Sequence, residues 1–178
     1  MNWVALQAIA EIVAAVGVII SLLYLAVQVR QNTKSIRSAA SQELLSNYHA
    51  VLESATQNEF GARIYHASFN GNWDELTIVE QGAARNGIIR MMRVYEQAFL
   101  QYRDRNLDDA IWEGWATQIK LSIGVPGVFQ VWSVIRPIMN GEFASWVDEH
   151  RTEGEHIAVD YLKRWHEISL NKNILSDD

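Results

Sequence analysis

Residues 3–29 read WVALQAIAEIVAAVGVIISLLYLAVQV, and this is the most apolar stretch of the chain. Its polar positions are Gln7, Glu11, Ser21 and Gln28. Residues 12–27 carry no charge at all. Because a membrane-spanning helix needs about 20 predominantly apolar residues, we expect a transmembrane helix over residues 1–30. The alternative is a buried helix inside a soluble bundle, since core helices are also strongly apolar.

Three cations, Arg30, Lys34 and Arg37, follow the apolar stretch at once. With Glu11 as the only acid before them, they give residues 1–37 a net charge of +2. Lys and Arg gather beside membrane helices on the cytoplasmic side, where anionic headgroups attract them. We therefore expect a single pass with the amino terminus outside. No basic segment precedes the stretch and no small-residue cleavage site follows it, so we interpret it as a retained anchor rather than a signal peptide.

One face of the predicted helix collects its polar and small residues. The predicted seam consists of Gln7, Ala10, Glu11, Ala14, Gly17, Ser21 and Gln28. Its polar members fall on the series 7, 11, 14, 18, 21, 25, 28, whose steps alternate between four and three residues as in left-handed helix–helix seams. Its small members lie four or three residues apart, which lets helices approach closely. This pattern favours a homo-oligomer. The alternative places the end residues at the membrane interfaces and lets Ser21 bond to its own helix.

The rest of the chain has the pattern of an all-α domain. Gln31 to Gln57 lacks Gly and Pro, so the first helix is predicted to continue to about Asn58. Further helices are predicted over 59–69, from Thr77 to about Arg105, from Asp108 or Asp109, from Pro126, around Phe143–Val147 and around Ile157–Ile168. Together they predict a cytoplasmic α-helical domain over 31–172 and a polar tail over 173–178.

Several aromatic and apolar side chains are predicted to point inward. They are Phe60, Ile64 and Tyr65 in the short helix, and the tryptophans Trp112, Trp115, Trp132, Trp146 and Trp165. Trp3 instead fits the aromatic belt at a membrane surface. An aromatic-lined pocket among the inner tryptophans is the alternative to a filled core.

Composition excludes several classes of protein. The chain has 178 residues and no cysteine, which excludes disulfides, thiolate catalysis and cysteine-based metal sites. The 12 basic and 20 acidic residues after Arg37 give that part a net charge of −8. An acidic domain repels phosphates, so we expect no nucleic-acid partner.

Two clusters in the domain are candidate sites. Arg85, Arg90 and Arg93 fall on one predicted helix and are suited to an anionic ligand or an acidic partner, with pairing to acids such as Glu96 as the alternative. Glu153 and His156 have the spacing of half a di-iron site. The second half is missing, so the sequence predicts a solvated charged segment, no metal and no cofactor.

The run Ser21-Leu-Leu-Tyr-Leu-Ala-Val-Gln-Val-Arg-Gln-Asn-Thr33 resembles the opening of a group of small bacterial proteins. Pro126-Gly-Val-Phe-Gln-Val-Trp132 and Glu142-Phe143 are similar to a later region of the same group. The resemblance implies one amino-terminal membrane helix, a helical domain and a place in the bacterial inner (cytoplasmic) membrane. The group has no assigned activity, so the resemblance implies no catalytic residue.

The sequence contains no nucleophile elbow, phosphate loop, dinucleotide fingerprint or zinc-protease motif. We therefore expect a non-enzymatic, membrane-anchored scaffold or interaction protein that binds the lipid bilayer, sister copies and an unknown protein partner. One alternative is an ion- or proton-conducting oligomer, because a ring of Glu11 carboxylates can line a pore. Another is a ligand-sensing or metal-dependent enzyme.

Overall fold

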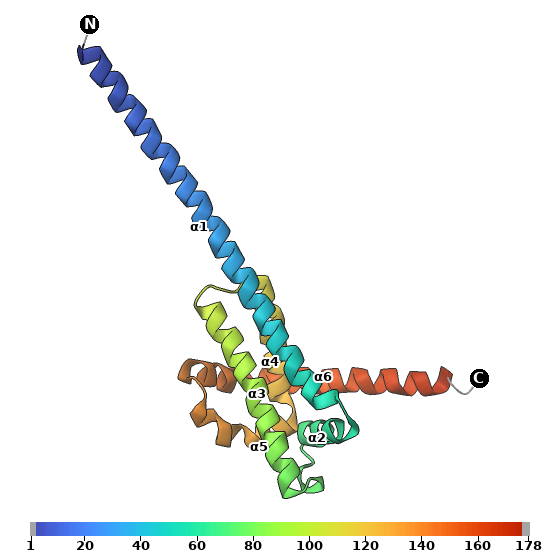
Figure 1. Ribbon diagram of the computed structural model, residues 1–178. Coiled ribbons are helices and arrows are strands. Elements are labelled where there is room, and N and C mark those ends of the chain that lie inside the picture. Colours follow the sequence, from blue (N-terminus) through green and yellow to red (C-terminus); the bar gives the residue numbers. More distant parts are fainter. Residues whose placement is uncertain (1–2, 176–178) are drawn as a thin grey trace. The chain divides into compact units, whose positions relative to one another are not determined.

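The computed structural model describes residues 3–175, apart from the side chains of residues 5, 6, 8, 10, 13 and 169–175. Six α-helices and two short 3-10 helices make up this part, and it contains no strand (Figure 1). The all-α prediction is therefore confirmed. The chain divides into two compact units, Met1–Ala39 and Ala40–Asp178. Residues 1–2 and 176–178, the ends of the predicted anchor and tail, lie outside the described residues.

Helix α1 runs without a break from Trp3 to Thr56, close to the predicted end at Asn58. The absence of Gly and Pro from residues 18–56 explains this continuity, since those residues interrupt helices. The second unit begins where α1 first buries side chains. Ala40 and Leu44 are buried there, and Tyr48 is half-buried against the same core.

Helix α2 spans Glu59–Asn70. The Asn58 side chain accepts a hydrogen bond from the Gly61 N–H at 2.8 Å, which caps its amino end. Gly71 ends it with a left-handed φ of 80°. Ile64 is buried as predicted, but the prediction for Phe60 is wrong because its side chain is 56% exposed. The first turn of α2 places Phe60 beside the buried face rather than on it.

Helix α3 spans Ile78–Arg103 and follows the 3-10 turn Trp73–Glu75. A capping box begins the helix: the Thr77 hydroxyl accepts from the Glu80 N–H, and the Glu80 carboxylate accepts from the Thr77 N–H at 2.7 Å. Glu80 also pairs with Arg63 of α2. The capping residue thus joins two helices.

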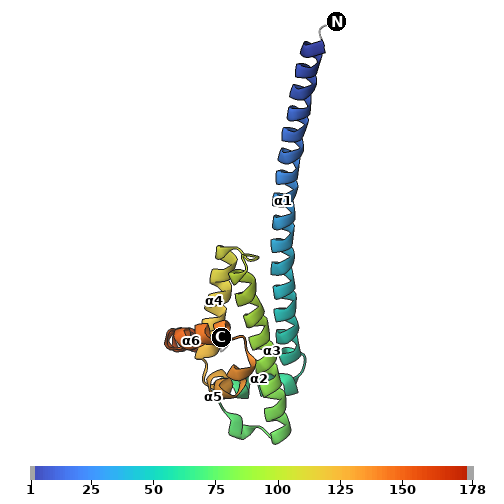
Figure 2. The ribbon, with the colours of Figure 1, turned by 90° about the vertical axis from the view of Figure 1, so that its left-hand side faces the viewer.

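Helices α4 and α5 span Asp109–Gly124 and Pro126–Ile135, and the 3-10 turn Arg136–Ile138 follows. Pro126 sits at the start of α5, where its missing N–H leaves no intrahelical bond unmade. Pro137 lies in this 3-10 turn, where it cannot continue the α-helix. Figure 1 and Figure 2 show α4 beside α3, with α5 and α6 packed against this pair.

Helix α6 is continuous from Gly141 to Leu175, where the sequence indicated two shorter helices. Gly154 explains the difference. A Cβ on Gly154 would lie 2.4 Å from the Lys120 carbonyl oxygen, and a Cβ on Gly124 would lie 2.0 Å from the Gly154 oxygen. Gly154 is therefore the point where α6 crosses α4 at close range, not a break. Beyond this crossing, Trp165 is 54% exposed, so its predicted place in the core is wrong.

Aromatic rings fill the core of the second unit. Tyr102 stacks on Trp112 with ring centroids 4.6 Å apart, and Tyr48 meets Trp115 edge to face at 5.5 Å. The Tyr95 hydroxyl lies 2.7 Å from the Ser122 hydroxyl, and burial raises the pKa of the Tyr95 phenol. The space beside Trp132 and Phe129 has a volume of only about 10 Å³, which is about the size of one water molecule and not a ligand pocket.

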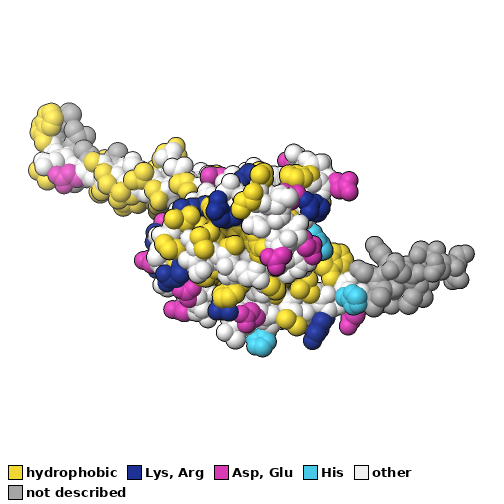
Figure 3. Space-filling view, turned by 90° about the horizontal axis from the view of Figure 1, so that it is seen from below, with side chains coloured by type: hydrophobic (Ala, Val, Ile, Leu, Met, Phe, Trp, Pro, Cys, Tyr) yellow, Lys and Arg dark blue, Asp and Glu magenta, His cyan; other side chains and the backbone are white. Residues whose placement is uncertain are grey.

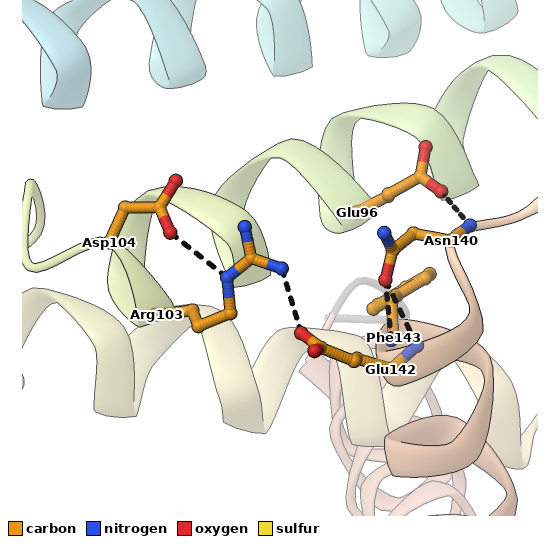
Figure 4. Close-up of polar contacts among 6 residues, drawn as sticks. All are labelled: Glu96, Arg103, Asp104, Asn140, Glu142 and Phe143. Carbon is orange, nitrogen blue, oxygen red and sulfur yellow. Dashed lines mark hydrogen bonds and ion pairs between the residues drawn. The ribbon is translucent and has the colours of Figure 1, made fainter.

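The start of α6 is held against α3. Arg103 of α3 pairs with Glu142 at 2.7 Å, and Glu96 of α3 accepts a hydrogen bond from the Asn140 N–H (Figure 4). The Asn140 side chain in turn accepts from the N–H groups of Glu142 and Phe143, at 3.0 and 3.3 Å. Phe143 is completely buried at this junction.

Candidate functional site

The first unit exposes an apolar helix surface. Every residue from 14 to 36 is exposed, and large apolar side chains dominate between residues 16 and 29. They are Val16, Val18, Ile19, Ile20, Leu22, Leu23, Tyr24, Leu25, Val27 and Val29. Figure 3 shows hydrophobic side chains along this segment on the face in view. A contiguous apolar surface of this kind marks contact with a membrane or a protein.

The length of this surface matches a bilayer. Residues 12–29 span about 27 Å as an α-helix, against about 30 Å for the hydrocarbon core. Among the described residues, Ala14–Thr56 is the one helical segment long and apolar enough by itself to cross a membrane. The bent pair α4 and α5 passes the same test only if both helices count as one span despite their 93° bend. That pair carries core residues such as Ile119 and Val128.

The polar side chains of the predicted seam form hydrogen bonds within their own helix. Gln7 donates to the Glu11 carboxylate at 3.1 Å, and Gln28 donates to the Tyr24 hydroxyl at 2.8 Å. The Ser21 hydroxyl donates to the Gly17 carbonyl at 2.8 Å, which is the local bond that the alternative interpretation names. Four residues separate the partners in each pair, so the helix itself brings them together.

The small members of the seam leave its surface open. Ala14 and Gly17 are exposed, while the side chain of Ala10 lies outside the described residues. A Cβ added to Gly17 would meet no atom within 4 Å. Nothing within the described part of this chain therefore needs a glycine at position 17.

The predicted membrane-surface cations follow the apolar segment on one side of the helix. Arg30, Lys34 and Arg37 lie four and three residues apart, which places them on one face. Arg30 and Lys34 are exposed, and neither forms an ion pair with another described residue. Arg37 is half-buried.

The structure separates the three predicted arginines of α3. Arg93 donates to the Glu96 carboxylate and to the Ile138 carbonyl oxygen, both at 2.7 Å, so it serves the domain's own packing. Arg85 and Arg90 are exposed, and neither pairs with a described carboxylate. Of these two, Arg90 lines a cavity.

The Glu153 and His156 cluster does not assemble a metal site. Lys120 of α4 donates to the Glu153 carboxylate at 2.9 Å, and this bond lowers the pKa of Glu153. Within residues 3–175, no three His, Asp or Glu side chains come close enough together to hold a metal ion. Glu153 instead joins α4 to α6 beside the glycine crossing.

The cavity is a feature that the sequence interpretation missed. It has a volume of about 290 Å³ and lies between the end of α1, α2 and α3. Small residues on all three helices line this space, among them Ala55, Ser68 and Gly87. A signal was present in the run Gly-Ala-Ala-Arg-Asn-Gly at 82–87, where large apolar side chains are absent for six consecutive residues.

A scan against protein-family models and searches of curated proteins and of solved structures found no match to this chain. The resemblance to small bacterial membrane proteins therefore stays a prediction, and function has to be argued from the chain's own residues.

Proposed function

We propose that the protein is a membrane-anchored, self-associating helical scaffold or interaction protein without enzymatic activity. One observation supports this most strongly: the apolar side chains of residues 14–29 are exposed along about four consecutive helical turns. Exposing them to water would be costly at about 25 cal/mol per Å² of apolar surface. A lipid bilayer covers such a surface without any further protein.

The proposed location is the bacterial inner membrane, with the amino terminus outside and the helical domain in the cytoplasm. Arg30 and Lys34 support this orientation, because they are exposed beside the apolar segment and available to anionic headgroups. The test is protease accessibility of tags fused to each end in sealed inner-membrane vesicles of known orientation. Both tags on the same side of the membrane would reject a single pass.

Self-association through the seam is the second part of the proposal. Gly17 supports it, because the glycine leaves a gap that no residue of its own chain uses, and glycines of this kind let two helices approach closely in lipid. Gln7, Ser21 and Gln28 each donate one hydrogen bond within their own helix. Close packing at the small residues would therefore be the main contribution to association.

The test compares Gly17→Leu with Ala26→Leu in the full chain in mild detergent. Both variants add the same side chain to the exposed helix, but residue 26 lies about 120° around the helix from Ala14, away from the seam. We expect Gly17→Leu to lower the subunit count measured by light scattering, and Ala26→Leu to leave it unchanged. Equal effects, or a monomeric parent protein, would reject the seam.

A further inference from the structure

The cavity between α1, α2 and α3 has an apolar floor. Ile64 of α2 and Ile88 and Met91 of α3 line it and are each less than a tenth exposed. Protein interiors are normally packed without voids larger than a water molecule. A space of about 290 Å³ beside these side chains is therefore an unfilled part of the domain.

The size of the cavity suits a small molecule. An engineered apolar cavity of about 150 Å³ binds benzene. The present cavity is about twice as large, which is room for about twelve non-hydrogen atoms at the same packing. It lies near the lower end of the usual range for ligand pockets, and is too small for a protein helix with several anchoring side chains.

The rim of the cavity carries one cation and no acid. Arg90 and Asn86 lie one turn apart on α3, and both line the cavity. No Asp or Glu is among the lining residues. Arg90 forms no ion pair with any described residue, in contrast to Arg93 one turn further on, which pairs with Glu96. An exposed guanidinium is thus available at the mouth of an apolar cavity.

We propose that this cavity binds a medium-chain monocarboxylate, a linear acid of about ten carbons in all. The guanidinium of Arg90 would hold the carboxylate, since the two groups form paired charge-assisted hydrogen bonds. The Asn86 amide adds a donor beside it. The tail would lie over Ile64, Ile88 and Met91. A single arginine matches a monoanion, whereas phosphate groups are recognised by clusters of arginines.

Neighbouring glycines on α3 provide a way to fill the cavity. A Cβ added to Gly87 would meet no atom within 4 Å, and Gly87 lines the cavity. Gly82 on the same helix is equally open but lies outside the cavity lining. A leucine at either position adds the same bulk to α3, and only the one at position 87 occupies the proposed site of the tail.

The experiment measures binding of radiolabelled decanoate to the full chain in phosphatidylcholine nanodiscs by equilibrium dialysis, with empty nanodiscs as the background. We expect saturable binding of one decanoate per chain above that background. Arg90→Gln should weaken it about tenfold or more, since it removes a charge-assisted contact. Arg85→Gln, the matched change at an arginine that lies outside the cavity and pairs with no described carboxylate, should leave it unchanged. Gly87→Leu should abolish binding, and Gly82→Leu should retain it.

Competition identifies the ligand class. Unlabelled decanoate should displace the label, whereas 1-decanol and acetate, which lack the charge and the tail respectively, should compete at least about tenfold more weakly. Decanol that competes equally well would overturn the role of Arg90. Binding that survives Gly87→Leu would place the ligand elsewhere, and no binding above empty nanodiscs would overturn the proposal altogether. None of the residues changed in this experiment belongs to the anchor or to the seam. The test of the cavity is therefore independent of the test of the proposed function.

Discussion

The carboxylate of Glu96 accepts a hydrogen bond from the backbone N–H of Asn140, across 44 residues of sequence (Figure 4). Glu96 is buried on α3, and Asn140 is the residue that caps the start of α6. The other carboxylate oxygen of Glu96 accepts from Arg93, which also donates to the Ile138 carbonyl. One buried acid thus fixes the turn between α5 and α6 on the middle of α3.

Glu96→Ala should destabilise the folded domain by about 1–3 kcal/mol, because it leaves the Asn140 N–H and the Arg93 guanidinium without their acceptor. Glu96→Gln should cost less, since its amide oxygen retains one of the two bonds. The measurement is urea unfolding of the full chain in detergent, followed by tryptophan fluorescence. The control is Glu142→Ala, which removes an exposed pair with Arg103 and should cost at most about 1 kcal/mol. Equal losses for both variants would contradict this account.

Gly124→Ala should destabilise the domain by about 1–3 kcal/mol or more, because overpacking usually costs this much. The added methyl would overlap the Gly154 backbone, at 2.0 Å from its oxygen, and backbone has little freedom to move aside. Gly114→Ala is the control on the same helix, because a Cβ there meets nothing within 4 Å. It should stabilise the helix by up to about 1 kcal/mol. Thermal unfolding by circular dichroism distinguishes the two, and a neutral Gly124→Ala would show that α4 and α6 do not meet closely.

Local features of the fold could be predicted from the sequence. The capping box of Thr77 and Glu80, the turn at Gly71 and the break before Pro126 each depend on residues within four positions of one another. Such signals act through backbone hydrogen bonds and φ preferences, so a single sequence displays them. The all-α class followed from these signals and the helical spacing of apolar residues.

Features that depend on distant residues could not be predicted. Gly154 has low helix propensity, and only its contact with Gly124, thirty residues earlier, shows why α6 continues through it. Nothing in the sequence distinguishes Arg90 from Arg93. Only the fold brings Ile138 and Asn140 beside α3, where Arg93 donates to the Ile138 carbonyl and Glu96 accepts from the Asn140 N–H. The cavity has the same origin, since three helices must meet before small side chains leave a space.

Asp148 makes the stability of the domain depend on pH. Its carboxylate accepts from the Trp132 indole and from the Arg136 guanidinium, each at 2.8 Å. Burial acts to raise the pKa of Asp148, but these two bonds outweigh it and hold the pKa below the ordinary value of 3.8. Folding therefore favours the ionised form. The resulting stabilisation is complete above pH 3.8 and is lost as the pH falls through the lowered pKa.

Asp148→Asn should accordingly be less stable than the parent protein at pH 7. The difference between their free energies of unfolding, called the gap below, should become smaller below about pH 4. The gap at pH 7 should be about 0.5–1 kcal/mol, because the side chain is 41% exposed and solvent screens the pair. Urea unfolding at several pH values measures it. Asp160→Asn removes a more exposed pair with Arg164 and should have little effect at any pH. A gap that widens in acid would show that the pKa of Asp148 is raised instead.

Ile19→Arg should reduce membrane insertion, because a charge near the middle of a spanning helix costs about 2.5–3.5 kcal/mol. Ile36→Arg is the matched control, since Ile36 is equally exposed but follows Arg30 and Lys34, where a cation faces headgroups. The measurement is the fraction of the full chain that stays with the membrane after alkaline carbonate extraction. We expect the parent and Ile36→Arg to stay in the membrane and Ile19→Arg to be partly extracted. If the parent itself is extracted, the apolar surface of α1 is covered by protein rather than lipid, and the anchor proposal fails.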